Sequence, residues 1–174
     1  YSFNNFEAIF YDLWIKTDFL SKSSNQTIIV AQDEQSDQFL GEQFTYSYAT
    51  NLKILQRILQ DKPLMIAFFL PLNEPESDVE IRYFEQLRDS LEIYRQQGGL
   101  VHFSDHLELW GMRLPPESLR PMGHSMTIIN EDSEEFSKDS VSRRAVLSVS
   151  SKETIHQWMA NQYNNAKGLK ALDY

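Results

Sequence analysis

Apolar residues near the start of the chain recur at helical spacing. Phe3, Phe6, Phe10 and Leu13 lie three or four residues apart. This spacing predicts an amphipathic entry helix over residues 3–20, with its apolar stripe facing a core or a partner chain.

Two short apolar runs farther along the chain have a different pattern. Ile28–Ala31 is continuous and β-branched, and Leu64–Leu70 is the strongest apolar run in the sequence. Such runs are typical of strands that are buried on both faces of a parallel sheet. Between them, apolar residues at helical spacing predict a helix over about 46–60. Together the three segments predict a β-α-β unit with a right-handed crossover.

A loop and a longer helix follow the second run. Pro71–Pro75 is expected to be a loop, after which Ser77 and Glu80 have the spacing of a helix-capping box. The helix is expected to continue to about residue 97, where Gly98 and Gly99 stop it. Its inward residues are predicted to be Val79, Tyr83, Phe84, Leu87, Leu91 and Tyr94.

The second half of the chain contains shorter signals. Apolar runs predict strands at 100–103, 126–129 and 145–149, with residues 105–122 irregular and a long acidic loop over 130–142. A second capping-box spacing, Ser150 with Glu153, predicts the start of an exit helix over about 152–167. Its apolar residues are Ile155, Trp158 and Met159.

The order of these elements predicts one α/β domain over residues 1–174. We expect a mostly parallel central sheet of about five strands, with helices packed on it and helices at both termini. The α/β core is expected to cover about 26–150, between the entry and exit helices.

Composition narrows the class of protein. The formal net charge of −9, spread along the chain, gives no general attraction for nucleic acid or anionic lipid. Hydrophobic residues make up 41%, which is enough for a folded core. The absence of cysteine excludes disulfides and thiolate metal sites, and it suits an oxidising compartment. A chain that begins with Tyr1 is expected to be a processed or excised piece of a longer protein.

Several segments, in order, resemble one known family. They are Tyr11–Lys16, Ile28–Ser36, Met65–Pro75, Gly123–His124 and Asp139–Leu147. Together they are similar to the second type of CHASE domain, the cyclase- and histidine-kinase-associated sensory extracellular domains, and the resemblance covers about residues 6–150. The sequence departs from the family pattern at Phe69, where an aspartate is usual, and at Ser140, where a glycine is usual.

The resemblance implies a place in a larger receptor. It implies a transmembrane helix before residue 1, further spans after residue 174, and a cytoplasmic cyclase, diguanylate cyclase or kinase as output. The chain would then be the periplasmic, or extracytoplasmic, portion of an inner-membrane protein.

Two groups of polar residues are candidates for ligand binding. Asp33 and Glu34 follow the run Ile28–Ala31, and Asn73 lies in the loop after Leu64–Leu70. Ligands of open α/β sheets bind at the carboxyl ends of parallel strands. These acids could instead cap a helix or fix a loop.

The second group lies later in the chain. Gly123 permits close backbone approach, and His124 could contact a ligand, report pH, or be a buried histidine bonded to a carbonyl. Arg143 could bind an anion, although a structural pair with Asp139, four residues earlier, is also expected.

A metal or catalytic site is not expected. His102 and His106, with Asp105 and Glu108, have metal-ligand residue types. Their four-residue spacing brings ligands together on a helix, whereas this segment is predicted to be a strand end and a loop. The sequence also has no Gly-rich phosphate loop, nucleophile elbow or cysteine nucleophile. We therefore predict a binding module that has no cofactor and is not an enzyme.

Three functional hypotheses follow. The first is a homodimeric sensor domain that responds to an unknown small-molecule or physical stimulus by favouring one helix arrangement over another. The second is a degenerate response-regulator receiver, with Asp33 and Glu34 as its acidic pair and Phe69 in place of the phosphoacceptor aspartate. The third, a hydrolase-like enzyme using Asp33 and His124, has only the presence of those residues in its favour.

Overall fold

The structure is a computed structural model that describes residues 27–43, 45–108, 111–127, 148–149 and 151–171. Of these, residues 27–33 belong to one compact unit, and all the others belong to a second, larger unit. The predicted entry helix 3–20 and the predicted loop 130–142 lie outside the described residues. The elements below all belong to the larger unit.

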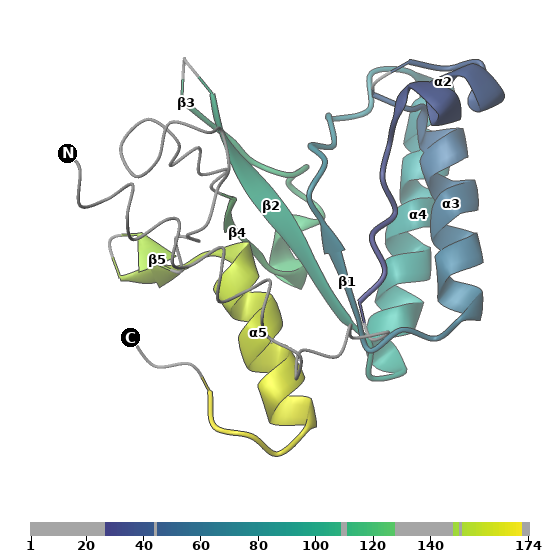
Figure 1. The fold of residues 1–174 in the computed structure, drawn as a ribbon. Helices are drawn as coiled ribbons and strands as arrows, with labels where there is room; N and C mark the ends of the chain where they lie inside the picture. The colour runs from purple at the N-terminus through teal and green to yellow at the C-terminus, as the bar shows by residue number, and fades with distance from the viewer. Residues whose placement is uncertain (1–26, 44, 109–110, 128–147, 150, 172–174) are drawn as a thin grey trace. The chain divides into compact units, whose positions relative to one another are not determined.

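A mixed four-stranded sheet is the centre of the larger unit (Figure 1). Its strands are β1 (Met65–Phe68), β2 (Leu100–Glu108), β3 (Gly111–Arg113) and β4 (His124–Thr127). The long strand β2 pairs in parallel with β1 and β4 and antiparallel with β3. The α/β class is therefore confirmed, but within the described residues the sheet is mixed and has four strands, where about five mostly parallel strands were predicted.

The pairing register places β1 and β3 on the same side of β2. Phe103 pairs with Phe68 of β1 and with His124 of β4, so these two strands flank β2 on opposite sides. His106 pairs with Arg113 of β3 and with Thr127 of β4. Because β4 runs along one side without a break, β3 follows β1 on the other side.

The first predicted strand is wrong. Residues 27–33 have no regular secondary structure, and Ile28 and Ile29 are 81% and 85% exposed. A continuous apolar run becomes a buried strand only when other elements cover it, and nothing in the run itself provides that cover. The predicted β-α-β unit is therefore wrong as well. The parallel pair β1–β2 is instead connected through the helix α4 (Asp78–Gln96).

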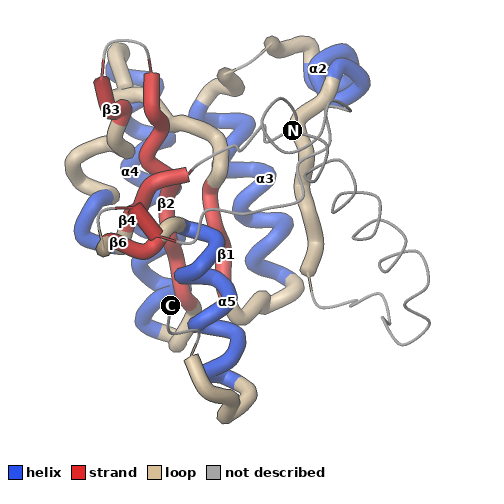
Figure 2. Tube along the Cα trace, turned by 60° about the vertical axis from the view of Figure 1, so that its left-hand side comes forward, coloured by secondary structure: helices blue, strands red, loops and turns tan. Residues whose placement is uncertain are grey.

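One face of the sheet is covered by α3 (Tyr48–Gln60) and α4 (Figures 1 and 2). Both helices begin where the sequence indicates, because Ser47 and Ser77 are N-caps that accept hydrogen bonds from the backbone N–H of Thr50 and Glu80. The buried core between the helices and the sheet contains Tyr48, Leu52, Leu55, Ile66, Phe84, Leu87, Leu91, Tyr94, Val101, Phe103 and Leu119.

Two residues predicted to face inward on α4 point outward. Val79 is 52% exposed and Tyr83 is 37% exposed, whereas Leu87 and Leu91 are fully buried. Val79 and Tyr83 thus lie to one side of the buried stripe of α4, which contains Phe84, Leu87, Leu91 and Tyr94. The helix ends as predicted, with Gly98 N–H donating to the carbonyl of Arg95 and Gly99 N–H to that of Tyr94.

The other face of the sheet carries α5 (Ile155–Ala166), which Figure 2 shows in front of the strands. Ile155 and Trp158 are its buried residues. The helix begins after Thr154 as N-cap, so the predicted start at Ser150 and Glu153 is wrong. Glu153 instead lies in the strand β6 (Lys152–Glu153), which forms a hairpin with β5 (Ser148–Val149).

Four further features were not predicted. They are the short helix α2 (Glu34–Leu40), the 3₁₀ turn η1 (Arg120–Met122), and the extension of β2 beyond residue 103 with its partner β3. The prediction of an irregular segment over 105–122 is therefore wrong for its first part. Polar residues interrupt the apolar pattern of β2 after Phe103, and these are the residues that form the candidate site.

Candidate functional site

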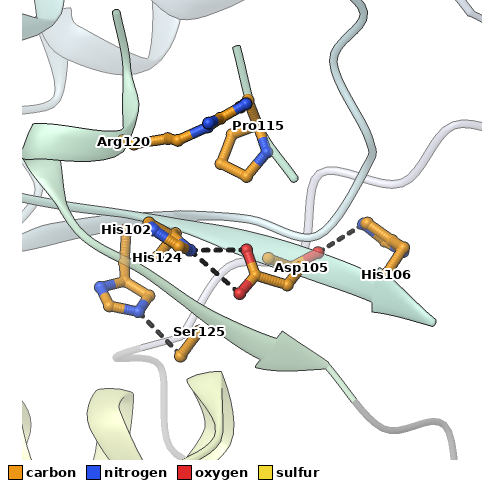
Figure 3. Close-up of polar contacts among 8 residues, drawn as sticks. His102, Asp105, His106, Pro115, Arg120, His124 and Ser125 are labelled. Atoms are coloured by element: carbon orange, nitrogen blue, oxygen red, sulfur yellow. Dashed lines mark hydrogen bonds and ion pairs between the residues drawn. The ribbon is translucent and has the colours of Figure 1, made fainter. Parts of the chain in front are cut away.

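Alternation along β2 divides its polar side chains between the two faces of the sheet. His102, Ser104 and His106 lie on the face that α5 covers, and Asp105 lies with Phe103 on the opposite face. His124 is the register partner of Phe103, so it shares the face of Asp105. The result is two small polar clusters on opposite sides of one strand pair (Figure 3).

Asp105 and His124 form the first cluster. The His124 Nδ1 atom lies 2.8 and 3.0 Å from the two carboxylate oxygens of Asp105. Because a carboxylate only accepts, Nδ1–H is the donor, and this fixes the tautomer and orientation of the ring. The Asp105 side chain is 12% exposed and that of His124 is 31% exposed. A fixed, partly exposed imidazole is a group that a ligand could contact.

His102 forms the second cluster with residues of β4 and α5. Its Nε2 lies 2.8 Å from the hydroxyl oxygen of Ser125, and its ring stacks on Trp158 with centroids 4.2 Å apart. Burial, together with the nearby His124, lowers the pKa of His102 to about 4. The ring is therefore neutral over the ordinary pH range, and it joins the sheet to α5.

Ser104 and His106 complete the same face. The Ser104 hydroxyl donates to the carbonyl of Phe69 at 3.3 Å and lies 2.5 Å from His106 Nε2. Burial and the Arg113 guanidinium lower the pKa of His106, against the opposing effect of Asp105 and Glu108.

The potential metal ligands of this segment do not converge. The segment is a strand and not the predicted strand end and loop, so Asp105 points to the face opposite His102 and His106. The two histidines bond to different serines, and Glu108 pairs with Arg113 at 3.3 Å. Within the described residues no group of three or more ligand-type side chains is arranged for a metal ion.

Asn73 ties the loop after β1 to two other elements. Its backbone carbonyl accepts the hydroxyl of Tyr48 on α3, and its side-chain oxygen accepts from Arg113 on β3. Burial raises the pKa of Tyr48 well above its usual range, and the carboxylates of Glu74 and Glu80 add to this effect. The hydroxyl therefore stays protonated as a donor. Asn73 itself is exposed, so its amide can still meet a ligand.

Asp33 and Glu34 do not follow a strand. Both are exposed, and Glu34 is the first residue of α2. Asp33 belongs to the smaller unit, whereas Glu34 and His124 belong to the larger one. The receiver hypothesis loses support, because it needs an acidic pair at the end of a strand. Asp139 and Arg143 lie outside the described residues.

Gly123 has both properties that the sequence suggested, a backbone φ of 113° and a close neighbour. That neighbour is His102, whose Nδ1 lies 2.9 Å from where a Cβ on Gly123 would be. Glycine at this position thus makes room for the histidine ring.

Sequence reasoning identified His124 as a candidate but did not pair it with Asp105, and it found no connection between His102, Ser125 and Trp158. No alternating signal marked this part of β2, because Ser104, Asp105 and His106 are three consecutive polar residues. The contacts with Ser125 and Trp158 join segments 23 and 56 positions away in the chain, which no local pattern reports.

Comparison with known proteins gives a match at the level of family. The family model described as the CHASE2 domain matches residues 1–172. Comparisons with curated proteins and with solved structures found no match. None of the helices in the described ranges is long and apolar enough to cross a membrane.

Proposed function

The chain belongs to the CHASE2 family of extracellular sensory domains, and from this premise we propose that it is the input domain of a membrane-anchored bacterial receptor. The match over residues 1–172 carries the proposal, because it covers essentially the whole chain. The family is sensory and not catalytic. In the proposed receptor the domain is periplasmic, and it controls a cytoplasmic cyclase, diguanylate cyclase or kinase.

The proposed receptor is a homodimer with membrane helices flanking each domain. A stimulus acts on such a receptor only if it has different affinities for two arrangements of the domain. α5 is the element that we propose to differ between them. It is the last described helix of the chain, and it is bound to the sheet mainly through the two buried residues Ile155 and Trp158.

The proposed ligand contacts are His124 and Asn73. The imidazole of His124 is held in one orientation by Asp105 and keeps an exposed edge. Asn73 is fixed by Tyr48 and Arg113 while its side chain is exposed. Both are preoriented polar groups, which lowers the ordering cost of binding a small molecule. A thermal-shift screen of small molecules tests these contacts, since a ligand of the folded state raises the unfolding midpoint, and His124→Gln removes that rise.

The location outside the membrane is tested by cysteine labelling of the full-length gene product. These 174 residues contain no cysteine, so Val79→Cys introduces the one thiol of this domain, at a position that is 52% exposed, and the parent full-length protein without the substitution gives the background labelling. Cells with a permeabilised outer membrane are treated with a maleimide that cannot cross the inner membrane. We expect labelling before lysis.

The matched control is Leu87→Cys on the same helix, which is fully buried. It is expected to react only after denaturation, which shows that the domain was folded during labelling. Labelling of Val79→Cys only after the inner membrane is broken would place the domain in the cytoplasm and overturn the proposal.

A further inference from the structure

All four histidines of the chain lie in the sheet or in the helix on its face. His102 and His106 are on β2, His124 is on β4, and His156 is on α5. His102 is the histidine of the sheet that contacts α5, and His156 of α5 contacts Phe69, directly after β1, with ring centroids 5.4 Å apart. The ring of His102 is 7% exposed and stacks on Trp158 at an angle of 21° between the planes.

The surroundings of His102 suit a neutral ring. Nε2 is satisfied by the Ser125 hydroxyl, which can donate or accept. Nδ1 lies against Gly123 and has no hydrogen-bond partner in the described part of the chain. An imidazolium must donate from both nitrogens, so a second proton would leave a charged N–H without an acceptor among these residues.

Among the described residues, no carboxylate faces His102 from the elements packed around it. β1 carries no ionisable side chain, and the ionisable residues of α5 are His156 and Tyr163. Asp105 points to the opposite face and is bound to His124. Glu108 pairs with Arg113, and Lys152 and Glu153 of β6 are exposed. The nearby His124 opposes a positive charge on His102.

We propose that His102 is an acid-sensitive lock: the neutral ring holds α5 against the sheet through Trp158, and protonation of the ring releases the helix. The added proton comes from solvent and occupies the second ring nitrogen. The charge that it brings is stabilised by water once α5 has moved away, and it is not stabilised while the ring is covered. The lock gives the proposed receptor a stimulus, external acid, and an element that responds to it.

The direction of the pH effect follows from the two states of the ring. The pKa of His102 is about 4 with α5 in place, against an ordinary value of 6.5. Released and locked states are equally protonated at high pH, and the released state takes up the proton first as the pH falls. The lock is thus complete above about pH 6.5 and weakens as the pH falls toward 4.

Hydrogen exchange of the α5 backbone amides in the full chain tests the lock. After correction for the intrinsic effect of pH, the opening constant of α5 is expected to rise about 30-fold between about pH 8 and about pH 5. The amides of α4, which packs on the other face of the sheet, serve as an internal reference and are expected to change much less.

Two variants separate the lock from a general effect of acid. His102→Phe keeps a ring to stack on Trp158 but cannot titrate, so its α5 opening is expected to stay flat over the same pH range. His156→Gln removes the histidine that α5 itself carries and is expected to keep the wild-type rise. A rise in His102→Phe equal to that of the wild type, or a flat wild type, overturns the lock.

A measurement on the wild type covers the case in which His102→Phe does not fold. The ring resonances of His102 are expected to titrate well below 6.5, near the value of about 4 given by its surroundings. If the His102 ring titrates with the ordinary pKa of 6.5 while the α5 amides remain protected from hydrogen exchange, the lock is overturned. His102→Gln, which keeps a polar partner for Ser125, is the replacement variant.

That release of α5 acts as a signal rests on the proposed sensory function. The hydrogen-exchange and titration measurements do not depend on that function. A flat α5 would overturn the lock and leave the receptor proposal standing. If the opening of α5 depends on pH but Val79→Cys is labelled only after the inner membrane is broken, the lock stands and the receptor proposal is overturned.

Discussion

The Cβ position of Gly123 points at the imidazole of His102, and a Cβ there would lie 2.9 Å from Nδ1. The next atoms that it would meet are Cε1 of the same ring and the carbonyl oxygen of Val101, at 3.4 and 3.7 Å. The ring cannot move away freely, because Trp158 stacks on it and Ser125 binds its other nitrogen. One glycine therefore fixes the position of a residue that joins the sheet to α5.

Gly123→Ala is expected to destabilise the domain by more than its backbone conformation alone explains. A matched control exists at Gly111, which also has a positive φ, 138°, but has no atom within 4 Å of its Cβ position. We expect Gly111→Ala to cost about 1 kcal/mol in urea unfolding and Gly123→Ala about 1–3 kcal/mol more, because the added methyl must also displace a packed ring. Equal losses for the two variants would contradict the contact.

The Asp105–His124 pair is expected to contribute measurably to stability, because Asp105 is only 9% exposed. Asp105→Asn removes the charge and keeps the shape, and it should lower the free energy of unfolding near neutral pH by about 1–3 kcal/mol. The control is Asp89→Asn on α4, whose 3.0 Å ion pair with Arg88 is exposed and should matter by less than about 0.5 kcal/mol. A loss at Asp105 no larger than that at Asp89 would show that the pair is not formed in solution.

The orientation of α4 is tested by two aliphatic residues of equal size on the same helix. Leu91 is fully buried and Ile93 is 55% exposed. Leu91→Ala is expected to cost about 2–5 kcal/mol, because it leaves a cavity in the core, whereas Ile93→Ala should change stability by less than about 0.5 kcal/mol. Chemical denaturation of both variants gives the comparison, and a reversed order would mean that the helix is rotated.

Glu42, which is not part of the sheet, is expected to make the free energy of unfolding of the domain depend on pH in the acid range. Burial raises the pKa of its carboxyl, but hydrogen bonds from the hydroxyl of Thr50 at 2.7 Å and the backbone N–H of Ser47 at 2.8 Å outweigh this and hold the pKa below 4.5. The contribution is present above 4.5 and is lost as the pH falls through the lower folded value.

Glu42→Gln should therefore remove part of the loss of stability on acidification. The measurement is urea unfolding of the two proteins at about pH 6 and about pH 3. Glu85→Gln, at an exposed position of α4, is the control and should follow the wild type. If Glu42→Gln loses as much stability as the wild type between the two pH values, the hydrogen bonds around Glu42 do not form.

The helices α3 and α4 and the strand β1 could be predicted from the sequence, because their apolar spacing and capping residues are local signals. Ser77 with Glu80 predicted a helix start that the structure confirms. Ile28–Ala31 has an equally strong apolar signal and is exposed, because burial depends on which elements cover a segment and not on the segment alone. In the same way, Val79 and Tyr83 were predicted to face inward from their residue type, but both are exposed.

The candidate site was less predictable than the fold. His124 was chosen for its residue type, and its carboxylate partner Asp105 was assigned to an irregular segment. The pair exists because parallel pairing of β2 with β4 places residues 19 apart in the chain on one face. The contact of His102 with Trp158 depends in addition on where α5 packs. Such long-range pairings follow from the complete fold and have no signature in a single sequence.

The central claim is that the sensory domain controls the activity of the output domain through the position of α5. Its most direct test is the output activity of the full-length receptor carrying Trp158→Ala, which removes the ring that binds α5 to His102. Leu169→Ala, at a position that is 57% exposed beyond the helix, is the control. We expect Trp158→Ala to shift the output under fixed conditions and to abolish its response to external acid, while Leu169→Ala leaves both unchanged. A folded Trp158→Ala receptor with wild-type output and an unchanged acid response would contradict the claim.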